Sequence, residues 1–247
     1  MSRISGWWVA LFFVCAVPLV GCGTSSGEKG GGIGAPTAAI ANTDADISSG
    51  CWSAADRGAS EGERTGSNVT FQQWSKPPEM AIDVNKTYRA TLDTSGGTIE
   101  IELFPKESPI TVNNFVCLAR AGYYDGTPFH RIVQGFVIQG GDPTGTGSGG
   151  PGYRIQDEPI SPNRNYTKGV VAMARTQQPN SGGSQFFICT GDLTGKLGKS
   201  YMIFGQVTSG MDVVDALDKT PTKSSSGGEK SSPIDPVTLN KVTITEA

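Results

Sequence analysis

Hydrophobic and polar residues alternate in short runs through most of the chain after residue 80. In TIEIELF (98–104), Ile99, Ile101 and Leu103 alternate with two glutamates, which predicts a strand with one buried face. The run TYRATLDT (87–94) precedes it across Ser-Gly-Gly, which predicts a hairpin. Further β-rich runs predict strands at 128–133, 136–139, 169–174, 185–190, 201–207 and 236–247.

Two segments have a helical period instead. SPITVNNFVCLARAGYYDG (108–126) places Ser108 at the N-cap, Pro109 at the first helical position and Gly122 at the stop. GMDVVDALD (210–218) predicts a second, shorter helix. Strands without a βαβ rhythm favour an antiparallel barrel or sandwich with helices over its ends, because closure removes exposed sheet edges. In the last strand the apolar positions change phase, which predicts a bulge near Asn240–Lys241.

The N-terminus has the pattern of an export signal. Arg3 precedes the apolar run 6–20, which is shorter than the ~20 residues that a bilayer span needs. The run ends in LVGC (19–22), which resembles the lipobox of bacterial lipoproteins. That resemblance implies cleavage before Cys22 and acylation of its thiol, and two or more acyl chains anchor a protein stably. We therefore expect a membrane lipid anchor on Cys22 and an extracytoplasmic location, periplasmic or cell-surface.

The expected organisation has four parts. Residues 1–21 form a lipoprotein signal peptide, and residues 22–50 hold the lipidated cysteine and a flexible Gly/Ser-rich tether. Residues 51–79 form a partly ordered lead-in, because a few aromatic residues stand in a polar, glycine-rich stretch. Residues 80–247 form the folded domain.

Charge and cysteine content narrow the function. Twenty Lys and Arg against 23 Asp and Glu give a net charge of −3, with no basic run, so we expect no nucleic-acid partner. Without Cys15 and Cys22, three cysteines remain, and at most one disulfide can form among Cys51, Cys117 and Cys189. Burial in apolar surroundings is the favoured interpretation of Cys117 and Cys189, and whether any disulfide forms stays open. With one histidine and no C-x-x-C spacing, we expect no metal site and no cofactor.

Three features could suggest other chemistry. Residues 145–150 match G-x-G-x-x-G, but no helix follows, so they predict a loop and not a dinucleotide site. Ser184 lacks the second glycine of a nucleophile elbow. His130, the only histidine, would have to serve any triad alone. A hydrogen-bonded structural histidine on a strand is favoured for it, and an acid–base role stays open.

Several long segments, in order, resemble the cyclophilin-type peptidyl-prolyl cis–trans isomerases. They are VNNFVCLARAGYYDGTPFH, FHRIVQGFVIQGGDPTGTGSGGPGY, MARTQQPNSGGSQFFICT and YMIFGQVTSGMDVVDAL, and the resemblance covers about residues 80–247. It implies a mainly β fold: a closed eight-stranded antiparallel β-barrel capped by two α-helices. It also implies that proline-containing polypeptides are the substrates and that no cofactor is needed.

The resemblance assigns site residues as well. Arg131 falls on the family's catalytic arginine. The positions that bind the substrate are implied to be Phe136, Val137, Gln139, Ala174, Arg175, Gln185, Phe187, Leu197 and Tyr201. Lys196, Arg175 and Tyr201 stand where many eukaryotic members have tryptophan, asparagine and histidine, so weak or absent cyclosporin binding is expected.

From these residues we predict a lipid-anchored isomerase that assists the folding of exported proteins and acts as a monomer. Two alternatives belong to other classes. One is a proline-peptide binding module or chaperone with incidental isomerase activity. The other is a solute-binding lipoprotein, which is disfavoured because it would need two α/β lobes.

Overall fold

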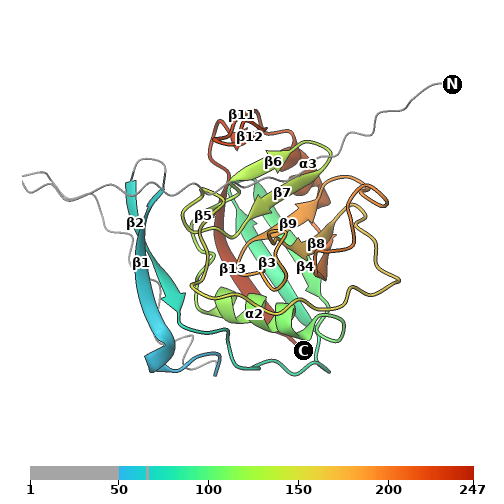
Figure 1. The fold of residues 1–247 in the computed structure, drawn as a ribbon. Coiled ribbons are helices and arrows are strands. Elements are labelled where there is room, and N and C mark those ends of the chain that lie inside the picture. The colour runs from blue at the N-terminus through green and yellow to red at the C-terminus, as the bar shows by residue number, and fades with distance from the viewer. Residues whose placement is uncertain (1–49, 65–66) are drawn as a thin grey trace, which may run out of the picture. The chain divides into compact units, whose positions relative to one another are not determined.

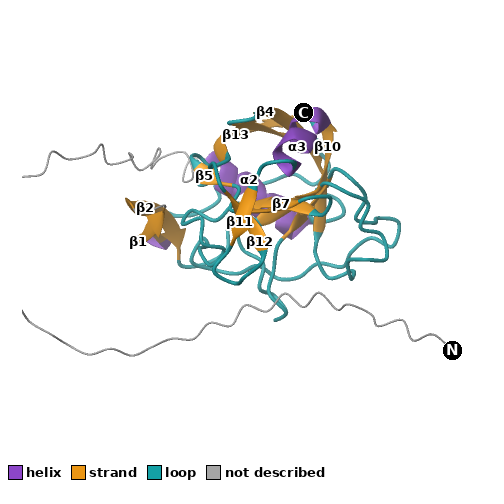
Figure 2. Cartoon of the chain, turned by 90° about the horizontal axis from the view of Figure 1, so that it is seen from above, coloured by secondary structure: helices purple, strands orange, loops and turns teal. Residues whose placement is uncertain are grey.

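The computed structural model describes residues 50–64 and 67–247. The signal peptide, Cys22 and nearly all of the tether lie outside this range. Within it, no helix is long and apolar enough to cross a membrane. These described residues fold into strands and two α-helices, joined by many turns (Figures 1 and 2).

The central element is a nine-stranded antiparallel sheet in the order β5-β13-β3-β4-β10-β8-β9-β7-β6. It curls into a half-barrel, as the alternating runs predicted, and neighbours in sequence such as β3 and β4 pair as a hairpin. Its strands are β3 (Tyr88–Thr94), β4 (Gly97–Leu103), β5 (Thr127–Pro128), β6 (Arg131–Val133), β7 (Val137–Gly140), β8 (Val170–Met173), β9 (Phe186–Cys189), β10 (Ile203–Ser209) and β13 (Thr238–Glu246).

The expected eight strands become nine because one predicted strand divides. The run 128–133 contains β5 at one end of the sheet order and β6 at the other. Only Phe129 and His130 connect the two strands, so the two edges of the sheet are joined by a two-residue link in the backbone. Among the described residues no ladder pairs β5 with β6, and the barrel is therefore not closed by hydrogen bonds. The predicted bulge in β13 is confirmed, since the register shifts between Leu239 and Lys241.

Helix α2 (Pro109–Arg120) lies under the curled sheet in Figure 1, and the shorter α3 (Met211–Asp218) lies beside β6 and β7. Ser108 is the N-cap residue of α2, as predicted, but its hydroxyl does not cap the helix. It donates to the carbonyl of Ile203 in β10 at 2.7 Å. The carboxylate of Glu158 accepts the Ile110 and Thr111 amides, at 2.8 Å each, so a distant loop satisfies the first turn.

The lead-in expected at residues 51–79 contains a hairpin. After the short 3-10 helix η1 (Ala54–Asp56), β1 (Arg57–Arg64) pairs with β2 (Ser67–Trp74). Trp74 stacks on Trp52 with ring centroids 4.2 Å apart, and both rings are buried in the main core. Cys51 forms a disulfide with Cys117 of α2. Cys117 is thus buried, as expected, and it takes part in the one disulfide that the cysteine count allows.

Candidate active site

The strand register brings a cation, an amide and an aromatic ring into one row. Arg131 on β6 is directly opposite Gln139 on β7, and Gln139 is opposite Phe187 on β9. Ile132 is buried in the main core, so its neighbour Arg131 faces the other side of the sheet. Directly opposite side chains on antiparallel strands lie within contact distance. Local pairing therefore assembles these three residues.

A chain of hydrogen bonds extends this row. Arg131 Nη1 donates to Gln139 Oε1 at 3.5 Å, and Gln139 Nε2 donates to Gln185 Oε1 at 3.0 Å. Gln185 Nε2 then donates to the carbonyls of Gly147 and Gly149, both at 3.0 Å. Each side chain is held by the next one, so three of the polar residues predicted for the site, Arg131, Gln139 and Gln185, form one connected network.

The glycine-rich loop at the end of this network is built around Asp142, which is fully buried. Its carboxylate accepts the amides of Thr144, Gly147 and Gly149, at 2.6–3.1 Å. A Cβ at Gly149 would collide with Asp142 Oδ1, so only glycine fits there. The G-x-G-x-x-G stretch is a loop, as predicted, and it also supports Gln185.

The apolar residues of the predicted site gather in a second hydrophobic cluster, separate from the main core. Val137 and Phe187 are buried, at 2% and 5% exposed, and the others are partly exposed around them. Tyr201 packs edge-on against Phe187 at a centroid distance of 5.4 Å. We call this surface the Phe187 patch; its members are Phe136, Val137, Ala174, Phe187, Leu197 and Tyr201.

Phe136 connects the patch to the cation. The guanidinium carbon of Arg131 lies 5.8 Å from the centroid of the Phe136 ring, within the range of a cation–π contact. The side chain of Arg131 is only 13% exposed. A charged donor is thus held at the edge of an apolar surface, where its hydrogen bonds are stronger than in bulk water.

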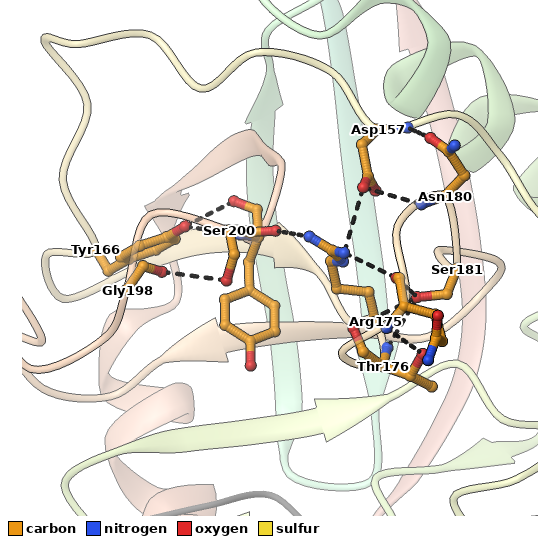
Figure 3. A network of polar contacts seen from close by, with 10 residues as sticks. Asp157, Tyr166, Arg175, Thr176, Asn180, Ser181, Gly198 and Ser200 are labelled. Carbon is orange, nitrogen blue, oxygen red and sulfur yellow. Dashed lines mark hydrogen bonds and ion pairs between the residues drawn. The ribbon is translucent and has the colours of Figure 1, made fainter. Parts of the chain in front are cut away.

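Arg175 is engaged in a network of its own (Figure 3). It donates to the carbonyls of Ser200 and Gln178, at 3.0 and 2.8 Å, and forms an ion pair with Asp157 at 3.3 Å. These contacts tie together three loops around the Phe187 patch. These contacts give Arg175 a structural function. The substrate-binding role that the resemblance implies for Arg175 stays a prediction, as does the weak or absent cyclosporin binding.

His130 differs from the expectation of a hydrogen-bonded histidine. Both ring nitrogens are buried, and neither has a hydrogen-bond partner among the described residues. Burial lowers the pKa of His130 to about 4; the carboxylate of Asp142 opposes this shift, and the charge of Arg131 adds to it. The imidazole is therefore neutral at pH 7 and lies beside the cation without adding to its charge.

The burial of the His130 ring predicts that the folded state loses stability in acid. The pKa of His130 is about 4 in the folded state and about 6.5 in the unfolded state, so between these values the unfolded chain binds more protons. The free energy of unfolding should fall as pH drops from 6.5 to 4, and His130 contributes up to about 3 kcal/mol of that loss. Urea unfolding of the wild type and His130→Gln at pH 7, 5.5 and 4.5 measures the difference. Parallel pH dependences would contradict it.

One residue near Arg131 was not predicted. Glu229 accepts hydrogen bonds from Arg131 Nε at 2.7 Å and from Nη2 at 2.9 Å. It stands in the stretch TPTKSSSGGEKSSPIDP (220–236), in which no motif was found. No local pattern marks this glutamate, because its partner is 98 residues away in the sequence.

Comparison with known proteins identifies the family of this chain. Residues 89–244 match the family model of the cyclophilin type peptidyl-prolyl cis-trans isomerases. The chain is a cyclophilin. The match covers more than half of the chain's length and includes Arg131, Gln139, the Phe187 patch and Glu229. The activity of this cyclophilin is peptidyl-prolyl cis–trans isomerisation.

Similar proteins come from bacteria and eukaryotes. This cyclophilin is 44% identical over 137 residues to the peptidyl-prolyl cis-trans isomerase of Helicobacter pylori, covering 55% of this chain and 83% of that one. It is 42% identical over 175 residues to isomerase A of Mycobacterium tuberculosis, covering 64% and 92%. A crystal structure of a Cryptosporidium parvum cyclophilin matches with a TM-score of 0.59 and 35% identity, over 64% of this chain and 98% of that one. The fold class and the family are confirmed.

Proposed function

We propose that Arg131 catalyses isomerisation by donating a hydrogen bond to the prolyl nitrogen while the proline ring rests on the Phe187 patch. The observation that carries this proposal is the row of Arg131, Gln139 and Phe187, set by the strand register. A second structure of the Cryptosporidium parvum protein was obtained in the presence of the dipeptide Ala-Pro, with a TM-score of 0.58 and 36% identity over 64% of this chain and 98% of that one. That finding supports the binding of proline-containing peptides here.

The chemistry follows from the amide bond. Resonance keeps its C–N bond planar, with a rotation barrier of ~18–20 kcal/mol, and unaided X–Pro isomerisation takes tens to hundreds of seconds. Rotation breaks the conjugation and leaves a lone pair on the prolyl nitrogen. A donor that points at this nitrogen binds the twisted state better than the planar one, and this difference in binding accelerates rotation.

The residues found around Arg131 suit this mechanism. Arginine stays protonated at every physiological pH and holds several donors in a rigid fork. We assign the Phe187 patch to the proline ring, and Gln139 and Gln185 to the flanking peptide backbone. Rotation transfers no proton and forms no covalent bond with the enzyme, so neutral His130 needs no role as a base.

The test is an isomerisation assay on a proline peptide, with the domain from residue 50 onward, comparing the wild type with Arg131→Ala. A large loss of kcat/KM in the variant supports the proposal, and undiminished activity overturns it.

We also propose that the enzyme acts outside the cytoplasm, anchored by lipid on Cys22, where it assists the folding of exported proteins. The Cys51–Cys117 disulfide supports this location, because disulfides persist in oxidising compartments and are rare in the cytosol. The LVGC sequence after an apolar run supports the anchor. The disulfide belongs to the folded domain and the LVGC sequence to the leader, so these two features are independent.

Metabolic labelling with a tagged fatty acid tests the anchor. We expect label in the full-length wild-type chain and in Cys15→Ala, and none in Cys22→Ala, which lacks the thiol that would be acylated. Cys15→Ala is the matched control, because it removes the other cysteine of the leader. Equal labelling of the wild type and Cys22→Ala would contradict the proposal.

A further inference from the structure

The segment 220–236 forms a second hairpin, which carries Glu229 to the catalytic cation. Strand β11 (Thr222–Ser224) pairs with β12 (Lys230–Pro233), and β12 packs against β6, which holds Arg131. Figure 1 shows this hairpin above β6. Glu229 is the residue just before β12. Its side chain accepts hydrogen bonds from Nε and Nη2 of Arg131, whereas Gln139 accepts one from Nη1.

Backbone contacts fix the position of Glu229. Its carbonyl accepts the amide of Ser225 at 2.8 Å, and Gly228 donates to the carbonyl of Ser225 at 2.9 Å. Gly228 has φ +82°, a left-handed conformation that favours glycine. Ser231, two residues further on, is 2% exposed. The glutamate thus stands on a built turn and not on an unstructured loop.

The contact uses one edge of the guanidinium. Glu229 takes Nε–H and one hydrogen of Nη2, and Gln139 takes one hydrogen of Nη1. An arginine side chain has five N–H donors in a planar fork. One donor on each terminal nitrogen is therefore left for another acceptor. A carboxylate on this edge can orient the fork without occupying the donors that the substrate would use.

We propose that Glu229 is a positioning residue for Arg131: it fixes the guanidinium so that the two remaining donors face the substrate. This role rests on the proposed function of Arg131. The hydrogen bonds from Arg131 lower the pKa of Glu229, so the carboxylate is ionised at neutral pH. A bidentate pair adds geometric specificity as well as energy, and most of the benefit of oriented groups in catalysis comes from such fixed geometry.

Glu229→Gln tests the proposal. The variant keeps the length of the side chain and one acceptor oxygen, but it cannot hold both nitrogens with a charged fork. We expect kcat to fall roughly tenfold with KM nearly unchanged, because the substrate contacts are retained and only the alignment of the donor is lost. Glu246→Gln is the matched control: Glu246 also pairs with an arginine at 2.7 Å, Arg120, and is equally exposed, at 41% against 40%. That variant should keep wild-type kcat.

A double-mutant cycle separates this proposal from the function of Arg131 itself. In an Arg131→Ala background, Glu229→Gln should change the remaining rate by less than about twofold, because the residue it positions is gone. An equal loss in both backgrounds, or a wild-type or higher kcat for Glu229→Gln, would overturn the positioning role alone. If Arg131→Ala is as active as the wild type, the proposed mechanism fails and the role of Glu229 fails with it.

Discussion

Arg131→Ala is expected to lower kcat/KM for a proline peptide roughly 100- to 1,000-fold, the loss that follows removal of one preorganised donor at a developing charge. The loss should appear mainly in kcat. The planar substrate needs little from the guanidinium, whereas the twisted amide presents a lone pair that only a donor stabilises. The Phe187 patch is intact in the variant, so KM should change little. Protease-coupled kinetics over a range of peptide concentrations would separate the two constants.

Arg164→Ala is the matched control for this experiment. The Arg164 guanidinium also forms a two-point pair with a glutamate, Glu107, at 2.6 and 3.0 Å, and it lies 3.8 Å from the ring centroid of Phe104. It thus has the same kind of surroundings as Arg131 outside the row of site residues, and its loss should leave kcat/KM near the wild-type value. Arg131→Lys should fall between wild type and alanine, because lysine keeps the charge but not the fork. Equal losses in the Arg131 and Arg164 variants would argue against a specific catalytic role.

Most of the sheet could be predicted because its strands carry their own signal. Ile99, Ile101 and Leu103 are all buried, and the two glutamates between them are exposed. The period of a strand faces one set of side chains to the core and the other to solvent, so burial can be inferred locally. The same reasoning located the bulge near Asn240, where the phase of the apolar residues changes.

The division of the run 128–133 could not be predicted. Its composition is that of one strand, but Phe129 is buried between β5 and β6, which pair with different partners. Where a strand ends inside an apolar run depends on the closure of the whole sheet and not on the residues themselves. His130 lies at this junction, and its ring nitrogens are buried with no hydrogen-bond partner among the described residues.

Polar partners across long sequence distances were missed for a related reason. Glu229 meets Arg131, Glu158 caps α2, and Asp157 pairs with Arg175, and in each case both partners come from segments far apart in the sequence. A glutamate in a Ser/Gly/Lys stretch has the same local pattern whether it is solvated or paired. The resemblance supplied the residues that are predicted to face the substrate, and the structure showed which residues hold several of them in place.

Removal of the Cys51–Cys117 disulfide is expected to have the largest effect on stability. The bond closes a loop with a sequence separation of 66, and the loss of chain entropy in the unfolded state predicts a stabilisation of roughly 4 kcal/mol. The Cys51→Ala/Cys117→Ala variant should therefore unfold at a midpoint temperature roughly 10 °C lower. The same bond ties Cys51 to α2, and with it the neighbouring Trp52, which stacks on Trp74. Without the bond, the β1–β2 hairpin should become more sensitive to protease.

The kinetic constants should not change when this stability is lost. Both half-cystines and both tryptophans belong to the main core, whereas the Phe187 patch is a separate cluster. At 25 °C we expect kcat/KM of the variant to stay within about twofold of the wild type, because neither half-cystine belongs to the Phe187 patch or to the row of Arg131, Gln139 and Phe187. Dithiothreitol should lower the wild-type midpoint to that of the variant and leave the variant unchanged. The one free thiol of the described residues, Cys189, is buried, and burial raises its pKa to about 12, so it should not react in either form. A midpoint of Cys51→Ala/Cys117→Ala equal to that of the wild type would show that the bond contributes no stability.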